Sequence, residues 1–206
     1  MSKIAIIGAD GNMGGRYAAC LDYLSYSYDC YDYYDWHVAC DNDHQYVIIA
    51  SPTDCHYENL KSFRHSKTHI LCEKPIVKDL AQLREVLSWE LNLTMVNQYK
   101  YLADPESEGE TKYNYFKTGN DGLEWDCINI IGLAKQKPVI KNSLPFWTCI
   151  INGRQVDLNE MDGAYVEMIR TWIKDPTRNT EYILNTHKRV VEGFYVSSDN
   201  WHTSKN

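Results

Sequence analysis

The chain has 206 residues, 44% of them hydrophobic, and a formal net charge of −7 at pH 7. This length fits one domain or two small ones with a packed core. The acidic balance argues against nucleic acid and anionic membrane surfaces, which attract clustered Lys and Arg. Apolar runs such as 47–50 are too short to span a bilayer, and no signal peptide is recognised. We expect no nucleic-acid or membrane partner.

The seven cysteines are an odd number, and no two have CxxC spacing. This usage favours a reduced, cytoplasmic protein. His37, Cys40 and His44 form a partial metal-ligand pattern, but a tetrahedral site needs four ligands and a supporting shell. We interpret them as part of a polar loop and expect no metal.

The first hundred residues alternate between strands and helices. Short apolar runs predict strands at 3–7, within 26–32, and at 47–51, 69–72 and 93–99. Helical spacing predicts helices from Met13 to about Leu24, from about 53 to 63, and from Asp79, a candidate N-cap, to about 91. The polar residues 35–45 predict a loop or a single helical turn, so one βα unit is abridged. The alternation indicates a doubly wound parallel sheet of Rossmann type over residues 1–101.

A glycine-rich turn follows the first strand. Gly8, Gly11 and Gly14 form G-x-x-G-x-x-G, one residue longer than the familiar G-x-G-x-x-G. Glycines permit the tight turn, the approach of a pyrophosphate and the close packing of helix on sheet, while the helix N-terminus attracts phosphate. The alternative is an ordinary glycine-rich turn. Asp32, twenty-four residues after Gly8, is the candidate for the adenosine ribose, with Asp29 and Asp35 as competitors. An acid there favours NAD over NADP.

Two further clusters follow later strands. Ser51-Pro52 and His56 come after the strand at 47–51, and Glu73-Lys74-Pro75 comes after the strand at 69–72. Ligands bind beyond the carboxyl ends of parallel strands, so both clusters are predicted to face the crevice of the glycine turn.

Residues 102–206 have a different pattern. Strands are predicted at 112–116, 147–151 and 155–158, the last two flanking the turn pair Asn152-Gly153. Helices are predicted at 125–134, 161–174 and 181–197. The polar stretch 103–111 lies near the start of this region. We expect a small α+β domain with a mainly antiparallel sheet.

With these motifs, the sequence resembles the Gfo/Idh/MocA oxidoreductase family over residues 1–101. His56, Glu73, Lys74 and Pro75 match its pattern, and Ser51 replaces the more frequent Thr. The resemblance implies a Rossmann domain, a substrate domain whose open sheet forms dimer contacts, an NAD or NADP cofactor and sugar or polyol substrates. It also implies a cis peptide before Pro75. Because members are commonly longer, the second domain would be reduced.

The resemblance implies that Lys74 is catalytic, contacting the substrate hydroxyl or carbonyl beside the nicotinamide. The family's Asp-x-x-x-His element is matched at Asp126, but Ile130 occupies the His position. Asp126 and Tyr99 are the candidate partners of Lys74. The candidate cofactor residues are Gly8, Asp10, Gly11, Asn12, Met13, Gly14, Asp32, Ser51, Pro52, His56, Glu73, Lys74 and Pro75.

The interpretation is therefore an NAD(P)-dependent oxidoreductase that transfers hydride between nicotinamide and a small hydroxyl or carbonyl compound. One alternative is a dinucleotide-binding sensor with weak or no activity, suggested by the reduced second domain and the missing His. A dihydrodipicolinate-reductase-like enzyme shares the glycine turn, but Glu73-Lys74-Pro75 argues against it.

Overall fold

The computed structural model describes residues 3–32, 34–102, 112–115, 123–134, 136–142, 148–151, 154–158 and 161–197. The chain divides into two compact units. The first contains residues 1–96 and 165–184, and the second contains residues 97–164 and 185–206. The predicted boundary at 101/102 lies close to the break at 96/97, but the return of residues 165–184 to the first unit has no counterpart in the sequence-based division.

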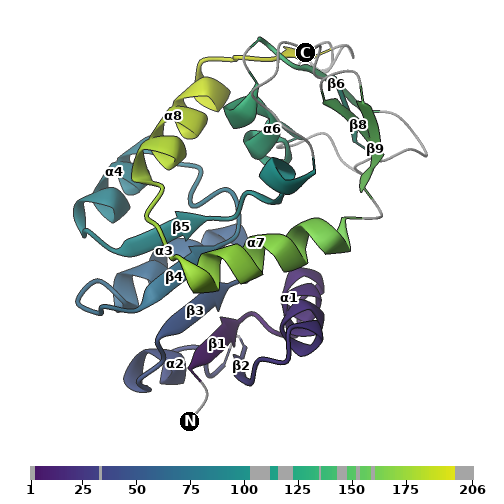
Figure 1. Ribbon diagram of the computed structural model, residues 1–206. Coiled ribbons are helices and arrows are strands. Elements are labelled where there is room, and N and C mark those ends of the chain that lie inside the picture. Colours follow the sequence, from purple (N-terminus) through teal and green to yellow (C-terminus); the bar gives the residue numbers. More distant parts are fainter. Residues whose placement is uncertain are drawn as a thin grey trace. The chain divides into compact units, whose positions relative to one another are not determined.

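The first unit is built on a parallel sheet of five strands in the order β2-β1-β3-β4-β5. The strands are β1 (Ile4–Ile7), β2 (Tyr28–Tyr31), β3 (Tyr46–Ile49), β4 (His69–Cys72) and β5 (Asn92–Met95). The strand β1 is buried along its whole length, and β3 and β4 are buried except at their first residues, as their continuous apolar runs predict. The predicted Rossmann-type sheet is confirmed (Figure 1).

Helices alternate with these strands: α1 (Asn12–Tyr23), α2 (Val38–Asp41), α3 (Thr53–Ser62) and α4 (Leu80–Ser88). The predicted N-cap of α4 is confirmed, since the Asp79 carboxylate accepts a hydrogen bond of 2.8 Å from the Gln82 N–H. The abridged βα unit is also present, because the four-residue α2 connects β2 to β3 and β2 forms one edge of the sheet.

A segment from the C-terminal half completes the first unit. It comprises α7 (Asp162–Lys174) from Tyr165 onward and the start of α8 (Thr180–Val191). The Asn179 side chain pairs with both backbone groups of Met95, at 2.9 and 3.1 Å. The Tyr46 hydroxyl donates to the Ile173 carbonyl at 3.2 Å. These contacts attach the segment to the sheet (Figure 1).

The second unit contains a five-stranded sheet in the order β10-β7-β6-β8-β9. Its strands are β6 (Lys112–Tyr115), β7 (Val139–Asn142), β8 (Thr148–Ile151), β9 (Arg154–Asp157) and β10 (Val196–Ser197). The β6–β8 and β8–β9 pairs are antiparallel, whereas β6–β7 and β7–β10 are parallel. The sheet is therefore mixed, and the expectation of a mainly antiparallel one is not confirmed. The predicted Asn152-Gly153 turn and the polar stretch 103–111 lie outside the described residues.

Three short helices belong to the second unit: η1 (Gln98–Tyr101), α5 (Leu123–Asp126) and α6 (Ile128–Leu133). The prediction of a single helix at 125–134 is wrong, because the helix is interrupted at Cys127, between α5 and α6. Arg189 of α8 fixes the end of α6. Its Nη1 lies 3.1, 2.8 and 2.9 Å from the carbonyl oxygens of Ile131, Gly132 and Ala134. A guanidinium in this place satisfies carbonyls that a helix C-terminus leaves without partners.

Replacing Arg189 with Ala should lower the free energy of unfolding by about 2 kcal/mol, because hydrogen bonds to charged groups contribute roughly 1.5–3 kcal/mol. Urea denaturation monitored by fluorescence measures this change. Arg170→Ala is the control. Arg170 is exposed on α7 and pairs with Glu167 on the same helix, so its loss should change stability by less than about 0.5 kcal/mol. Equal effects of the two substitutions would contradict the capping role.

Candidate cofactor and active site

The glycine turn connects β1 to α1 and leaves no room for side chains at two positions. Gly8 has a φ of +83°, and a Cβ there would lie 2.6 Å from the Ser51 backbone nitrogen. A Cβ on Gly14 would lie 2.1 Å from the Gly8 carbonyl oxygen. The first glycine therefore permits the turn and the approach of the next strand, and the last permits the helix to pack on the turn.

The N-terminus of α1 has the features of an anion site. Its N-cap is Gly11, and its first turn, which includes Asn12 and Met13, contains no acidic residue. The first N–H groups of a helix lack helical partners and carry partial positive charge. The turn thus offers donors to a pyrophosphate in the place that the sequence predicts.

Two carboxylates meet beside this turn. A hydrogen bond with Asp32 and the negative charge of Asp32 raise the pKa of the exposed Asp10. Asp32 follows β2 directly, and its N–H donates to the Asp35 carboxylate at 2.5 Å. Asp35, one of the predicted competitors for the ribose, therefore supports the turn that carries Asp32. The structure places Asp10 in the loop before α1, next to the acid predicted to bind the ribose.

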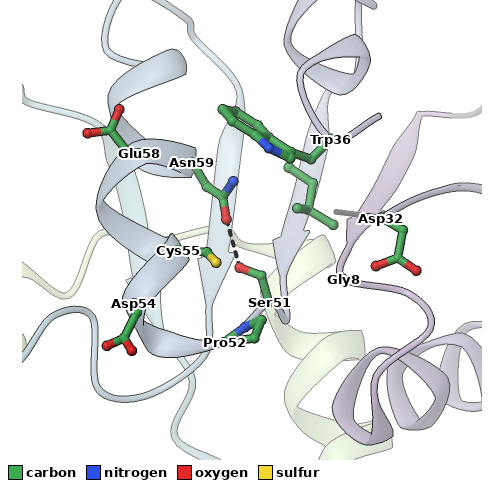
Figure 2. A pocket seen from close by; sticks show the side chains of 10 residues that line it. Gly8, Asp32, Trp36, Ser51, Pro52, Asp54, Cys55, Glu58 and Asn59 are labelled. Carbon is green, nitrogen blue, oxygen red and sulfur yellow. Dashed lines mark hydrogen bonds between the residues drawn. The ribbon is translucent and has the colours of Figure 1, made fainter. Parts of the chain in front are cut away.

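A pocket of about 380 Å³ lies at the carboxyl ends of β1, β2 and β3. Four predicted cofactor residues line it: Gly8, Asp32, Ser51 and Pro52. The pocket is also lined by residues that were not predicted from the sequence: Ile7, Trp36, Asp54, Cys55, Glu58 and Asn59. Figure 2 shows Trp36 at one end of the pocket and the α3 residues along one side. An indole beside an acidic strand end is suited to stack on a base whose ribose the acid binds.

Ser51 and Asn59 form one wall of the pocket. The Ser51 hydroxyl donates to the Asn59 side-chain oxygen at 2.7 Å (Figure 2). The carboxylates of Asp54 and Glu58 point away from this pair. Asn59 was not predicted as a site residue from the sequence. It is buried, and a buried side-chain amide needs a hydrogen-bond partner, which Ser51 provides.

His56 is buried, with 1% of its surface exposed. Its Nε2 lies 2.8 Å from the Ser51 carbonyl oxygen, and its Nδ1 lies 2.9 Å from that of Pro75. Both ring nitrogens therefore face backbone oxygens, and the ring connects the segments that follow β3 and β4. The described contacts give His56 a role in holding these two loops.

The Glu73-Lys74-Pro75 segment follows β4, as predicted, and the peptide between Lys74 and Pro75 is cis, which confirms the expectation. Lys74 is half-buried, and its N–H donates to the Glu73 carboxylate at 3.0 Å. The other Glu73 oxygen accepts a hydrogen bond of 2.6 Å from Tyr17 of α1. The Glu73 side chain is thus directed toward α1 within the protein.

The remaining catalytic candidates lie in the second unit. Tyr99 of η1 is buried, with 1% of its surface exposed, and Asp126 is the half-buried last residue of α5. Ile130 is fully enclosed in α6, an apolar position where the family pattern has His. A histidine from another element, His187 of α8, packs on Trp125 with ring centroids 4.9 Å apart. The Asp-x-x-x-His spacing could not predict this histidine, because it lies on a different helix.

Two of the three residues of the partial metal pattern, His44 and Cys40, have other surroundings. His44 Nε2 lies 3.0 Å from the Tyr31 hydroxyl, and burial raises the pKa of Cys40 to about 11. Among the described residues, no three His, Cys, Asp or Glu side chains gather as a metal site. In the same part of the chain, every helix is too short or too polar to cross a bilayer.

These features are typical of a Rossmann-type dinucleotide-binding domain, and comparison with known proteins agrees. Residues 19–93 match the family GFO_IDH_MocA, described as "Oxidoreductase family, NAD-binding Rossmann fold". Residues 19–93 are therefore similar to the NAD-binding domain of the Gfo/Idh/MocA oxidoreductases, the family that the motifs resemble. No curated protein matches the chain by sequence.

Solved structures share the fold over nearly the whole chain. The WlbA (WbpB) dehydrogenase from Thermus thermophilus, crystallised with NAD and UDP-GlcNAcA, is 13% identical, with a TM-score of 0.69 and 95% of each chain covered. A probable dehydrogenase from Thermotoga maritima has a TM-score of 0.71 at 13% identity, covering 94% of this chain and 95% of its own. Myo-inositol 2-dehydrogenase from Lactobacillus plantarum has a TM-score of 0.66 at 11% identity, covering 91% of this chain and 94% of its own. At these identities the likeness concerns the fold.

Proposed function

We propose that this protein is an NAD-dependent dehydrogenase or reductase that transfers hydride between the nicotinamide and a small hydroxyl or carbonyl compound of sugar or polyol type. The observation that carries the proposal is the convergence of the glycine turn, the pocket and Lys74 on the carboxyl edge of one parallel sheet. The adenosine ribose binds Asp32, the adenine lies against Trp36, and the pyrophosphate lies on the N-terminus of α1.

When bound, NAD supplies the hydride chemistry, and the protein's own groups handle the proton. Lys74 donates a hydrogen bond to the substrate oxygen and stabilises the charge that develops on it. We propose Asp126 and Tyr99 of the second unit as its partners. A homodimer through the second sheet, which the family resemblance implies, and a cytoplasmic location stay predictions.

The substrate class follows from chemistry and from relatives. A site that uses one lysine on an oxygen atom suits secondary alcohols and ketones, and related folds include an inositol dehydrogenase. Incubating the protein with NAD and a panel of sugars, polyols and their oxidised forms, while following nicotinamide absorbance, tests the proposal. Turnover of at least one compound is expected. Binding of NADH with no turnover across the panel would favour the sensor alternative.

The preference for NAD is tested at Asp32. A carboxylate accepts hydrogen bonds from two ribose hydroxyls but repels a 2′-phosphate, and the described lining of the pocket contains no Lys or Arg. Asp32→Asn should weaken NADH binding about tenfold, since hydrogen bonds to a charged group contribute roughly 1.5–3 kcal/mol. It should also reduce the ratio of NADH affinity to NADPH affinity.

Fluorescence titrations with NADH and NADPH measure both effects. The control is Asp43→Asn, which removes one exposed negative charge from a residue outside the pocket lining. If Asp43→Asn changes the NADH/NADPH ratio as much as Asp32→Asn does, net charge explains the preference and the assignment of Asp32 to the ribose is wrong.

A further inference from the structure

The side-chain amide of Asn59 faces the pocket with part of its hydrogen-bonding capacity unused. Asn59 lies on α3, lines the pocket and is buried, with 1% of its surface exposed. Its oxygen accepts a hydrogen bond of 2.7 Å from the Ser51 hydroxyl. No described residue accepts a hydrogen bond from its side-chain nitrogen, and this nitrogen is not one of the fully enclosed polar atoms without a partner. The N–H groups of the amide are therefore open to a ligand in the pocket.

An amide is an unfavourable group at a buried position of a helix unless something binds it. Asn is a weaker helix former than Leu, and a buried polar group costs free energy when its hydrogen bonds are not made. The next residue, Leu60, is completely buried in the apolar core, so the same turn of α3 packs well with an apolar side chain. A ligand that accepts from the amide therefore explains Asn59 better than packing does.

The groups around the amide suit a neutral, planar ligand. The described lining of the pocket contains no Lys or Arg but has three carboxylates, those of Asp32, Asp54 and Glu58. Such a lining disfavours a phosphate group. The backbone N–H of Trp36 donates to the Asp32 carbonyl at 2.9 Å, so the indole and the acid proposed for the ribose belong to one turn. Figure 2 shows the Asn59 nitrogen on the side of the pocket where Trp36 lies.

Adenine has the groups that an amide in this place recognises. Its exocyclic amino group is a donor next to a ring nitrogen that accepts, and an Asn side chain pairs with both of them. The Asn59 oxygen can accept from the amino group in addition to Ser51, because a carbonyl oxygen has two lone pairs. Hypoxanthine and guanine have an oxygen in place of the amino group. Their edge therefore sets an acceptor against the amide oxygen.

We propose that Asn59, oriented by the Ser51 hydroxyl, reads the edge of the base that stacks on Trp36 and makes the pocket selective for adenine over 6-oxopurines. The inference rests on the proposed function, because it names the group that recognises the adenine of the dinucleotide. The amide acts in binding and takes no part in hydride transfer. Its loss therefore changes dinucleotide affinity and leaves kcat at saturating cofactor nearly unchanged.

The test compares NADH with reduced nicotinamide hypoxanthine dinucleotide, which differs from NADH only in the base. Titrations follow the fluorescence of the nicotinamide that both compounds share. The wild type should bind NADH about tenfold more tightly, a ratio within the range for one bidentate contact to a base. Asn59→Leu, which has a similar size and no amide, should lose most of this preference. So should Asn59→Asp, which keeps an acceptor for Ser51 but removes the N–H groups.

Asn92→Leu is the matched control. Asn92 begins β5, lies outside the pocket lining, and donates its amide to the Lys67 carbonyl at 3.0 Å. Its replacement also removes one amide hydrogen bond from the same unit, yet the preference for NADH should stay about tenfold, as in the wild type. A general loss of structure lowers both affinities together, so the ratio of the two affinities separates recognition of the base from stability.

Equal affinity of the wild type for the two dinucleotides would overturn the inference, and so would an unchanged preference in Asn59→Leu. If the Asn59 variants do not fold, Ser51→Ala decides the matter. Without the hydroxyl that orients the amide, the preference should fall at least about threefold, and an unchanged preference would overturn the inference. A wild-type protein that binds neither dinucleotide contradicts the proposed function itself, whereas equal binding of both contradicts only the role of Asn59.

Discussion

Lys74→Ala should bind NADH with nearly wild-type affinity and lose turnover by about 10²- to 10⁴-fold, the usual contribution of a positioned acid–base group. The lysine follows β4, its neighbours Pro75 and Ile76 are buried, and its backbone is held by Glu73. Removing the side chain therefore removes the ammonium group and leaves the loop in place. The adenosine pocket does not include Lys74 among its lining residues, so cofactor affinity should persist.

Steady-state kinetics with the substrate found in the panel, together with NADH titration, measure this separation of kcat from binding. Lys78→Ala is the matched control, because Lys78 is an exposed lysine four residues further along the same segment. It should retain turnover. A Lys74→Ala protein that binds NADH and keeps full turnover would remove Lys74 from the mechanism.

Gly14→Ala should unfold the glycine turn or abolish NADH binding, whereas Gly15→Ala should do neither. The added methyl group at position 14 would lie 2.1 Å from the Gly8 carbonyl oxygen and 2.6 Å from the Ala9 Cα, both backbone atoms that cannot move aside cheaply. We expect a loss of about 3 kcal/mol or more, the upper range for overpacking, because the clash is with backbone.

Gly15 provides an unusually close control. It is exposed on the same helix, and a Cβ there would meet no atom within 4 Å. Gly15→Ala should stabilise the protein by roughly 0.5–1 kcal/mol, the difference in helix propensity between the two residues. Urea denaturation and NADH titration of both variants check the pair. Similar behaviour of the two would show that close packing at Gly14 does not shape the turn.

Residues 1–96 of the first unit could be predicted well, because the sequence patterns that mark their strands and helices are local. The strand at 69–72 has the predicted bounds. The N-cap at Asp79 could be predicted because an Asp directly precedes a run with helical spacing of apolar residues. Buried parallel strands appear as short apolar runs, and glycine and proline mark where they end. The motif residues followed because each lies directly after such a strand.

The missed features depend on contacts between distant segments. Periodicity predicted the helix at 161–174, but it indicates only that one face is buried, not that the face packs on the first sheet. The parallel β6–β7 pair joins strands separated by two helices, so no turn signal announces it. The orientation of the Glu73 side chain could not be predicted either, because its partner Tyr17 lies fifty-six positions away in the chain.

The sequence predicted where the candidate site lies in the fold, but it did not predict most of the residues that line the pocket. Gly8, Asp32, Ser51 and Pro52 line the pocket as expected, since strand ends define it. Trp36 was missed because it lies in the abridged unit, where the sequence shows polar residues and no regular period. His56 was assigned to the cofactor from the motif, whereas its described contacts are with two backbone carbonyls.

The most direct test of the account is a crystal structure of the protein with NAD bound. It should show the pyrophosphate on the N-terminus of α1, the adenosine ribose hydroxyls on Asp32, the adenine beside Trp36, and nicotinamide C4 facing the Lys74 ammonium. NAD bound with its nicotinamide away from Lys74, or its adenosine outside the pocket at β1–β3, would contradict the proposed mechanism and the assignment of the site.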